Sequence, residues 1–233
     1  MRAALLLDTT GRLEVGEVDV AEPGPGEVLV ETAAAGLCHS DIHLIDGSIP
    51  VATPSVLGHE ASGVVAAVGP GVTRVAPGDH VIACLSVFCG RCALCVRGET
   101  HLCVDKQATG RGPGEPPRLA LADGGQPVGA NASVGGLAER MLLHQNAVVA
   151  IRKDMPLDVA AIIGCAVTTG VGAACNTAAI RAGETVAVIG CGGIGLNIVQ
   201  GARLRGAGRI IAVDLLAAKR DLARSVGATH AAD

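Results

Sequence analysis

Four cysteines lie within one 15-residue segment of this 233-residue chain, with the spacing Cys-x2-Cys-x2-Cys-x7-Cys at Cys89, Cys92, Cys95 and Cys103. Two-residue spacers allow four thiolates to converge on one ion, and tetrahedral zinc holds sulfur at about 2.3 Å. The segment predicts a closed, structural zinc site. An iron–sulfur cluster is the chemical alternative, but Val104 stands where bacterial ferredoxins carry proline and the last spacer differs. Inert buried cysteines are the other alternative.

Cysteine usage also bears on the cellular compartment. The total of nine cysteines is odd, and a clustered metal site favours a reducing environment over a disulfide framework.

The apolar start of the chain meets Asp8 before it is long enough for a secretory signal. Residues 159–180 carry no charge and could nominally span a bilayer, but their Gly, Thr, Asn and Cys content favours a pair of buried helices. We predict a soluble, cytoplasmic protein without a membrane partner.

Composition excludes two further classes of protein. Hydrophobic residues make up 49% and charged residues 17%, which is typical of a globular chain and not of a disordered one. Phe88 is the one aromatic residue, so the core must consist of Val, Ile, Leu and Ala, and aromatic platforms for single-stranded nucleic acid are lacking. The net charge is −4 without a basic block, so no nucleic-acid partner is expected.

The first part of the chain has the pattern of a β-rich, barrel-like domain. Short β-branched runs at 27–31, 63–68 and 80–84 are separated by Pro-Gly and Gly-Asp turns. Residues 108–136 are dense in Gly, Pro and Asn and predict a long surface loop. We expect the first domain to cover residues 1–155.

The pattern changes after residue 156. Apolar runs at 185–189 and 209–213 alternate with helical spacing at 194–204 and 217–226, which predicts a βαβα unit with parallel strands. The fold class is therefore α/β plus β. Two strands and two helices are too few for a stable sheet, so we expect the second domain, 156–233, to be incomplete.

A glycine-rich turn follows the first of these apolar runs. Gly190, Gly192, Gly193 and Gly195 fall within a G-x-G-x-x-G motif between a predicted strand and a predicted helix, the context of dinucleotide binding. Asp214 ends the next strand, where a carboxylate can accept ribose hydroxyls and repel a 2′-phosphate. The turn predicts NAD in preference to NADP.

A longer string gives a family resemblance. Gly58-His59-Glu60-x2-Gly63-x5-Gly69-x2-Val72, with Gly-Leu-Cys-His-Ser-Asp at 36–41 and Gly-Cys at 164–165, resembles the zinc-dependent medium-chain alcohol dehydrogenases over essentially the whole chain. The resemblance implies an N-terminal GroES-like β-barrel domain whose structural zinc lobe is 89–103. It also implies that connecting helices and the first half of a Rossmann NAD-binding domain follow.

The same resemblance implies a second zinc ion per chain, held by Cys38, His59 and Cys165 with one position open to water or alcohol. Three ligands and a vacancy are typical of catalytic zinc, which lowers the pKa of a bound hydroxyl. Hydride then passes to NAD. The implied reaction is reversible oxidation of a primary or secondary alcohol to an aldehyde or ketone.

The resemblance also implies a proton path and groups that support the metal. Ser40 would receive the alcohol proton and His43 would pass it to solvent, since histidine titrates near neutrality. Asp41 would orient His59, and Glu60 would lie behind the metal. Taken alone, Ser40 and Asp41 could simply cap a helical turn, and His43 could be a surface residue.

Three further cofactor contacts come from the resemblance. His39 stands where several relatives place arginine on the cofactor pyrophosphate, Lys219 would lie near the adenosine ribose, and Thr169 near the nicotinamide. Surface solvation is the alternative for Lys219.

Family members continue beyond the point where this chain ends, so we expect a fragment or truncated product that turns over poorly or associates. The full-length protein is expected to be a homodimer or homotetramer acting on a small alcohol or aldehyde. Oxidation of a thiol adduct, such as S-hydroxymethyl-glutathione or a mycothiol adduct, is an alternative activity. The alternative from another class of protein is a binding or redox-sensing protein that zinc stabilises and that has no catalytic turnover.

Overall fold

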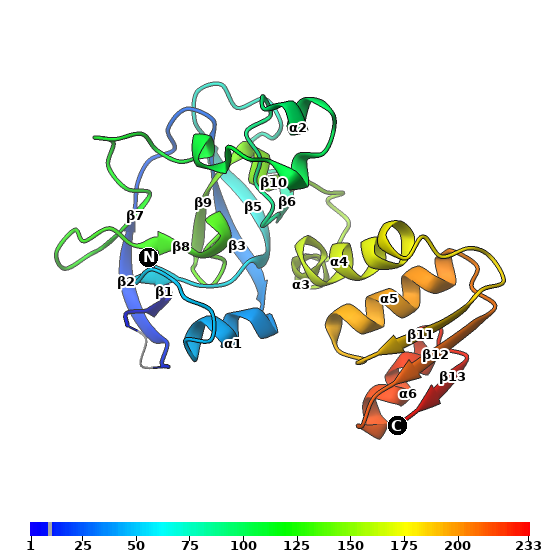
Figure 1. The fold of residues 1–233 in the computed structure, drawn as a ribbon. Coiled ribbons are helices and arrows are strands. Elements are labelled where there is room, and N and C mark those ends of the chain that lie inside the picture. The colour runs from blue at the N-terminus through cyan, green and yellow to red at the C-terminus, as the bar shows by residue number, and fades with distance from the viewer. Residues whose placement is uncertain (9–10) are drawn as a thin grey trace. The chain divides into compact units, whose positions relative to one another are not determined.

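The computed structural model describes residues 1–8 and 11–233, which divide into two compact units, Met1–Gly164 and Cys165–Asp233 (Figure 1). The segment after residue 156 packs on a sheet of the first unit. There Ser62 Oγ donates a 2.5 Å hydrogen bond to the Leu157 carbonyl. Each unit has its own aliphatic core.

One sheet of the first unit has the strand order β7-β2-β1-β4-β8. Its neighbours are antiparallel except for the short parallel pair of β4 and β8. The strands are β1 (Arg2–Leu6), β2 (Glu14–Val20), β4 (Ser55–Val56), β7 (Leu119–Leu121) and β8 (Gly129–Ala130).

The second sheet of this unit is antiparallel throughout, with the order β10-β6-β5-β3-β9. Val28, Val30 and Leu143 are completely buried in its core. Aliphatic residues form this core because the chain has almost no aromatic residues. The strands are β3 (Glu27–Gly36), β5 (Glu60–Val68), β6 (His80–Ala83), β9 (Arg140–His144) and β10 (Val148–Ala150).

Two glycines of the 58–72 string allow close backbone packing in this sheet. A Cβ atom on Gly63 would collide with the Glu31 carbonyl of β3, and one on Gly69 would collide with the Gly24 carbonyl. Gly63 therefore allows β5 to pack closely on β3, and Gly69 allows the turn after β5 to pack closely on the turn before β3.

Short helical turns connect the strands of the first unit. The expectation of a long loop over 108–136 is wrong, because its backbone pairs with β2 and β4 through strands of only three and two residues. Elements this short leave no readable periodicity. The helices are α1 (His39–Ile45), α2 (Ala93–Val96) and α3 (Leu157–Ala160), and the 3-10 turns are η1 (Thr100–Leu102), η2 (Lys106–Thr109), η3 (Asn131–Ser133), η4 (Gln145–Ala147) and η5 (Ala161–Gly164).

The second unit is a three-stranded parallel sheet in the order β11-β12-β13 with helices packed on it. The expectation of two strands misses β13, which lacks a β-branched run and is fixed by pairing with β12. Helix α5 packs on β11 and β12, α6 packs on β12 and β13, and α4 packs on α5 (Figure 1). The elements are α4 (Ala166–Gly172), the π turn η6 (Ala173–Thr177), β11 (Thr185–Ile189), α5 (Gly193–Leu204), β12 (Arg209–Val213), α6 (Ala217–Ser225) and β13 (His230–Ala232).

Among the described residues, no single helix has the length and apolar character needed to cross a membrane. The consecutive segments Leu157–Gly164 and Ala166–Thr177 reach that length and composition only when they are counted together.

Candidate functional site

The four cysteines of the lobe over 89–103 converge around α2 and η1. Their sulfur atoms all lie within 4.8 Å of one another. The distance from Cys89 Sγ to Cys95 Sγ is 3.9 Å and that from Cys92 Sγ to Cys95 Sγ is 3.4 Å. A tetrahedron with about 2.3 Å metal–sulfur bonds has edges of about 3.8 Å. The four sulfur positions therefore fit a zinc ion.

Backbone N–H groups of the lobe point at its sulfur atoms. The Cys89 N–H donates to Cys103 Sγ and the Cys92 N–H donates to Cys89 Sγ, each over 3.3 Å. Hydrogen bonds from the Cys95 and Val104 N–H groups lower the pKa of Cys92 to about 6. These donors favour thiolates, which are the form that binds metal.

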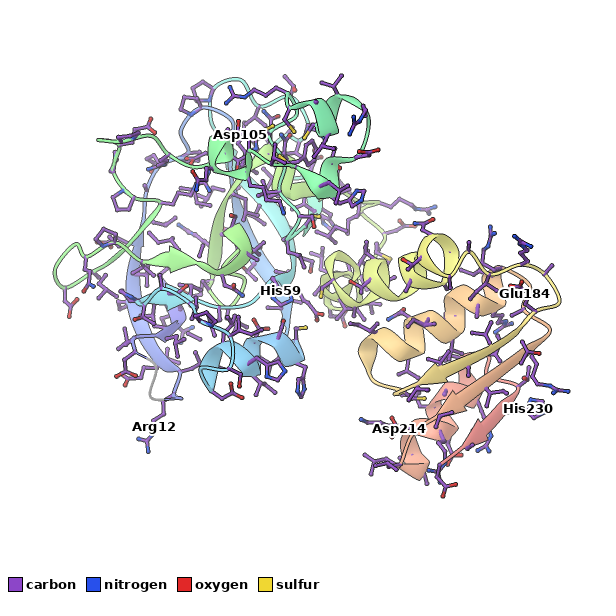
Figure 2. The ribbon with its side chains drawn as sticks, in the orientation of Figure 1. Arg12, His59, Asp105, Glu184, Asp214 and His230 are labelled. Atoms are coloured by element: carbon purple, nitrogen blue, oxygen red, sulfur yellow. The ribbon has the colours of Figure 1, made fainter. Side chains whose placement is uncertain are left out.

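Strand pairing brings together the residues of a second cluster. Cys38 follows β3 and caps α1, while His59 directly precedes β5 (Figure 2). Because β3 and β5 are antiparallel and Gly36 pairs with Glu60, the end of one strand meets the start of the other. The ligand atoms of Cys38, His59 and Glu60 lie within 4.8 Å of one another.

A buried carboxylate stands behind this cluster. Asp41 has no exposed surface. Its Oδ2 accepts the Cys38 N–H at 3.0 Å, which makes Asp41 part of a capping box. Its Oδ1 accepts the Gly58 N–H at 3.2 Å and lies 3.4 Å from His59 Nδ1. His59 Nε2 is therefore the ring nitrogen left for a metal.

The cluster has the electrostatics of a cation site. The hydrogen bond to Asp41 raises the pKa of His59 to about 9, against burial, and the Cys38 sulfur acts in the same direction. Burial opposes ionisation of Cys38, but hydrogen bonds from Ser40 and His59 lower the pKa of its thiol. The negative groups that favour a proton on His59 would equally favour a divalent cation, and sulfur with imidazole is a donor set that suits zinc.

The expected proton-path residues lie on α1. Ser40 and His43 are three positions apart and therefore share one helix face. The His43 ring lies edge-on to His39, with ring centres 4.8 Å apart, and its Nδ1 is 3.9 Å from Asp46 Oδ2. Glu60 is buried at 5% exposure, directly against Gly36.

Cys165, the third ligand that the resemblance implies, is the first residue of the second unit. It is buried, and its carbonyl accepts the N–H of Thr169, which is an exposed residue of α4. The preceding residue, Gly164, packs so tightly on the first unit that a side chain there would collide with the Ala83 carbonyl.

The glycine turn of the second unit joins β11 to α5. Gly190 has φ +91°, and a Cβ on Gly195 would collide with the Gly190 carbonyl. Gly192 precedes the first residue of α5, Gly193, and a Cβ atom on Gly192 would meet no heavy atom within 4 Å. The helix N-terminus is thus open to an anion.

Asp214 follows β12 (Figure 2) and accepts the N–H groups of Leu216 at 2.9 Å and Cys191 at 2.8 Å. These bonds lower its pKa, so it is a carboxylate at neutral pH. It borders a cavity of about 470 Å³ that combines this charge and one lysine with apolar walls. The lining residues are Ile189, Gly190, Val213, Asp214, Leu215, Leu216 and Lys219.

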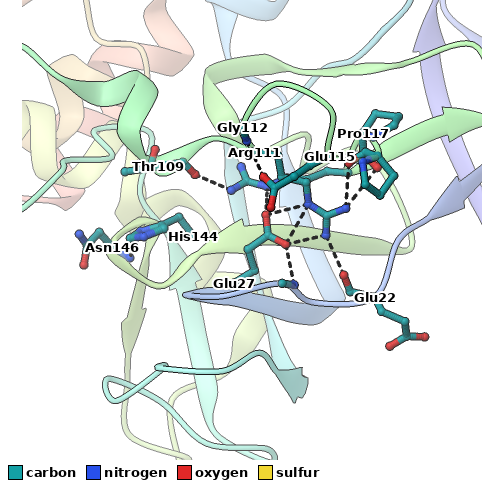
Figure 3. Close-up of polar contacts among 12 residues, drawn as sticks. Glu22, Glu27, Thr109, Arg111, Gly112, Glu115, Pro117, His144 and Asn146 are labelled. Atoms are coloured by element: carbon teal, nitrogen blue, oxygen red, sulfur yellow. Dashed lines mark hydrogen bonds and ion pairs between the residues drawn. The ribbon is translucent and has the colours of Figure 1, made fainter.

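One buried ion cluster could not be predicted from the sequence. Glu27 is 3% exposed and accepts a hydrogen bond from Arg111 Nη2 at 2.7 Å (Figure 3). It also accepts one from Arg118 Nε at 2.6 Å. Burial alone would raise the pKa of Glu27, but these hydrogen bonds and one from the Gly24 N–H lower it to about 2. The one sequence signal for this cluster is that Glu27, a charged residue, stands at the start of an aliphatic run. A second residue without a sequence signal is Asn131, whose Nδ2 lies 3.5 Å from Asp41 Oδ1.

Comparisons with known proteins give relatives along nearly the whole chain. The putative alcohol dehydrogenase D of Mycobacterium tuberculosis is 44% identical over 98% of this chain. The S-(hydroxymethyl)glutathione dehydrogenase of Paracoccus denitrificans is 45% identical, also over 98%. The chain spans 62% of the length of both relatives.

Solved structures agree with these relatives. An alcohol dehydrogenase zinc-binding domain protein from Burkholderia ambifaria has a TM-score of 0.92 at 36% identity, covering 100% of this chain and 63% of that one. Acetophenone reductase from Geotrichum candidum, solved in complex with NAD, has a TM-score of 0.80 at 30% identity, covering 99% of this chain and 62% of that one. Residues 24–153 match the alcohol dehydrogenase GroES-like domain. The chain belongs to the zinc-dependent medium-chain alcohol dehydrogenase family.

Proposed function

We propose that this chain is part of an NAD-dependent alcohol dehydrogenase that transfers hydride reversibly between a primary or secondary alcohol and the nicotinamide. The observation that carries the proposal is the cluster of Cys38 and His59 backed by the buried carboxylate of Asp41. It lies within the part of the chain that matches the alcohol dehydrogenase GroES-like domain.

Cys38, His59 and Cys165 would hold the catalytic zinc. Gly164 packs against the Ala83 carbonyl of β6, and Cys165 is the next residue in the chain. Its Cα atom is therefore about 3.8 Å from that of Gly164. When bound, zinc supplies Lewis acidity that lowers the pKa of a hydroxyl group. Asp41 holds the His59 ring with Nδ1 turned inward, and Glu60 adds a buried carboxyl group beside the ligands. The four-cysteine lobe would hold a second, structural zinc.

The α1 helix supplies the proton path in this proposal. Ser40 would accept the proton of the substrate hydroxyl, and His43 would carry it on toward solvent, because the two lie on one helix face and the His43 side chain is 42% exposed. His39 would add positive charge for the cofactor pyrophosphate.

The second unit would bind the ADP half of NAD. The pyrophosphate would lie against the N–H groups at Gly192 and Gly193, where the missing side chain leaves room. Asp214 would accept the ribose hydroxyls beside Lys219, with Thr169 near the nicotinamide. We propose residues 1–155 as the catalytic domain and 156–233 as the start of the cofactor domain.

The test is alcohol-dependent formation of reduced cofactor by the zinc-loaded full-length protein that contains this chain, over a panel of primary and secondary alcohols. We expect a rate above that of the metal-stripped chain, and His59→Ala should lower it roughly 1000-fold, because Lewis acidity contributes several kcal/mol. Cys84→Ser, a cysteine outside both clusters, should leave it unchanged. A full-length protein that carries zinc at Cys38 and His59 but oxidises no alcohol would contradict the proposal and favour a binding or redox-sensing protein.

The relative from Paracoccus denitrificans supports a second candidate within the same chemistry, oxidation of a thiol adduct of formaldehyde. The assay separates the two when it is run with formaldehyde in the presence and absence of glutathione. Turnover that requires the thiol would assign this second activity, whereas turnover of simple alcohols alone would exclude it.

A further inference from the structure

The segment over 129–137 wraps the loop that leads into His59. Strand β8 pairs with β4 in that loop. Two backbone bonds follow, from the Gly136 N–H to the Gly58 carbonyl and from the Leu137 N–H to the Leu57 carbonyl, both 2.9 Å. The position of His59 is therefore tied to a segment far away in sequence.

This segment contains an unusual turn. Ala132 and Ser133 both have left-handed backbone conformations, with φ 52° and φ 59°. Such angles are unfavourable for residues with a Cβ and persist where surrounding contacts impose them. The turn is closed by the Val134 and Gly135 N–H groups, which donate to the Asn131 carbonyl at 2.9 Å and 3.2 Å. These two hydrogen bonds therefore fix the backbone of Asn131.

The Asn131 side chain points at the carboxylate behind the metal cluster. Its Nδ2 lies 3.5 Å from Asp41 Oδ1, the same oxygen that faces His59 Nδ1. The opposite orientation of the amide would place a carbonyl oxygen against a carboxylate, so the NH₂ group is the end that faces Asp41. Because Asp41 has no exposed surface, its oxygens depend on donors inside the protein.

We propose that Asn131 is a positioning residue, which acts on the metal through Asp41 and His59. The inference rests on the proposed function, because it assumes that His59 binds zinc. The amide restrains Asp41 Oδ1 in addition to the backbone donor at Gly58, and this keeps the carboxylate in line with the His59 ring. Groups that orient a metal-binding histidine typically change metal affinity roughly 10–100-fold when they are mutated.

The experiment measures zinc release from the full chain to a chromogenic chelator. The four-cysteine lobe is the internal reference, because it lies outside the Asn131 contacts. Asn131→Leu removes the donor at similar size, and Asn131→Asp places a second carboxylate against Asp41. We expect both variants to release one zinc on the order of tenfold faster than the parent, the lower end of the range for groups that orient a ligand, and the other zinc at the parent rate.

Ala132→Gly is the matched control, because it relieves the left-handed strain and keeps the amide. It should leave both release rates unchanged. Release from Asn131→Asp at the parent rate would overturn the inference, even where Asn131→Leu fails to fold. Equal acceleration at both sites, or the same acceleration in Ala132→Gly, would also overturn it, since the effect would then be general loosening. A parent chain that binds a single zinc would instead refute the proposed function.

Discussion

Two buried carboxylates of the first unit differ in their partners, and the partners determine their roles. Glu27 is surrounded by two guanidinium groups, Arg111 and Arg118, so its charge is neutralised by fixed cations. Asp41 has backbone N–H groups, an imidazole and an amide as neighbours. Glu27 therefore stabilises the fold, whereas Asp41 would orient the His59 ring in the proposed metal site.

Glu27→Gln should destabilise the first unit by roughly 3–5 kcal/mol, because Arg111 and Arg118 keep their charges in a buried site without a counter-ion. Glu31→Gln on the same strand is the control. Its 3.7 Å pair with Arg140 is exposed, so it should change the free energy of unfolding by less than about 0.5 kcal/mol. Urea unfolding measures both, and equal effects of the two substitutions would refute a special role for Glu27.

The same residue predicts a pH dependence. The folded pKa of Glu27 is about 2 against an ordinary value of 4.5, so its stabilisation is complete above pH 4.5 and is lost as the pH falls toward 2. The shift corresponds to about 3 kcal/mol. The stability difference between the parent and Glu27→Gln should therefore narrow on acidification below pH 4.5. A difference that is constant from pH 7 to pH 3 would contradict this.

At the scale of elements, the sequence predicts well those strands that form continuous apolar runs. The runs at 185–189 and 209–213 coincide with β11 and β12, since their valine and isoleucine residues favour strands. Strand β3 extends past the predicted 27–31 to Gly36, because pairing with β5 overrides the low strand preference of Ala33–Ala35. Short strands such as β8 and β13 depend on their partners and leave no local signal.

The candidate site likewise contains residues that the sequence predicts and one that it does not. Cys38 and His59 belong to local motifs, and the pairing of β3 with β5 brings them together. Asn131 approaches Asp41 across 90 positions of the chain, through a turn whose left-handed residues are an alanine and a serine. No propensity favours these residues there, so the contact could not be read from the sequence.

The glycine turn gives a prediction for an element junction. Gly195→Ala should lower the free energy of unfolding of the second unit by about 1–3 kcal/mol, because the new methyl group meets the Gly190 carbonyl and pushes α5 from β11. Gly192→Ala has free space on the protein side, so it should leave stability unchanged but weaken NAD binding by blocking the pyrophosphate. Thermal unfolding and cofactor titration separate the two effects. The idea fails if both substitutions affect the same property.

At the scale of the whole molecule, the two units have separate cores, and the proposed function gives them separate tasks. Cys92→Ser should remove the structural zinc and lower the melting temperature of the first unit. Binding of ADP-ribose should persist, because Gly192 and Asp214 lie in the second unit. Calorimetric titration with ADP-ribose checks this, and loss of binding in Cys92→Ser would show that the units do not fold separately.

We expect this chain to hold two zinc ions in two different donor sets. Metal analysis of the purified chain, after a wash with a weak chelator, tests it most directly. We expect two zinc ions in the parent and one in each of Cys38→Ala and Cys92→Ser. A parent with one zinc ion or none, or a Cys38→Ala variant that retains two, would contradict it.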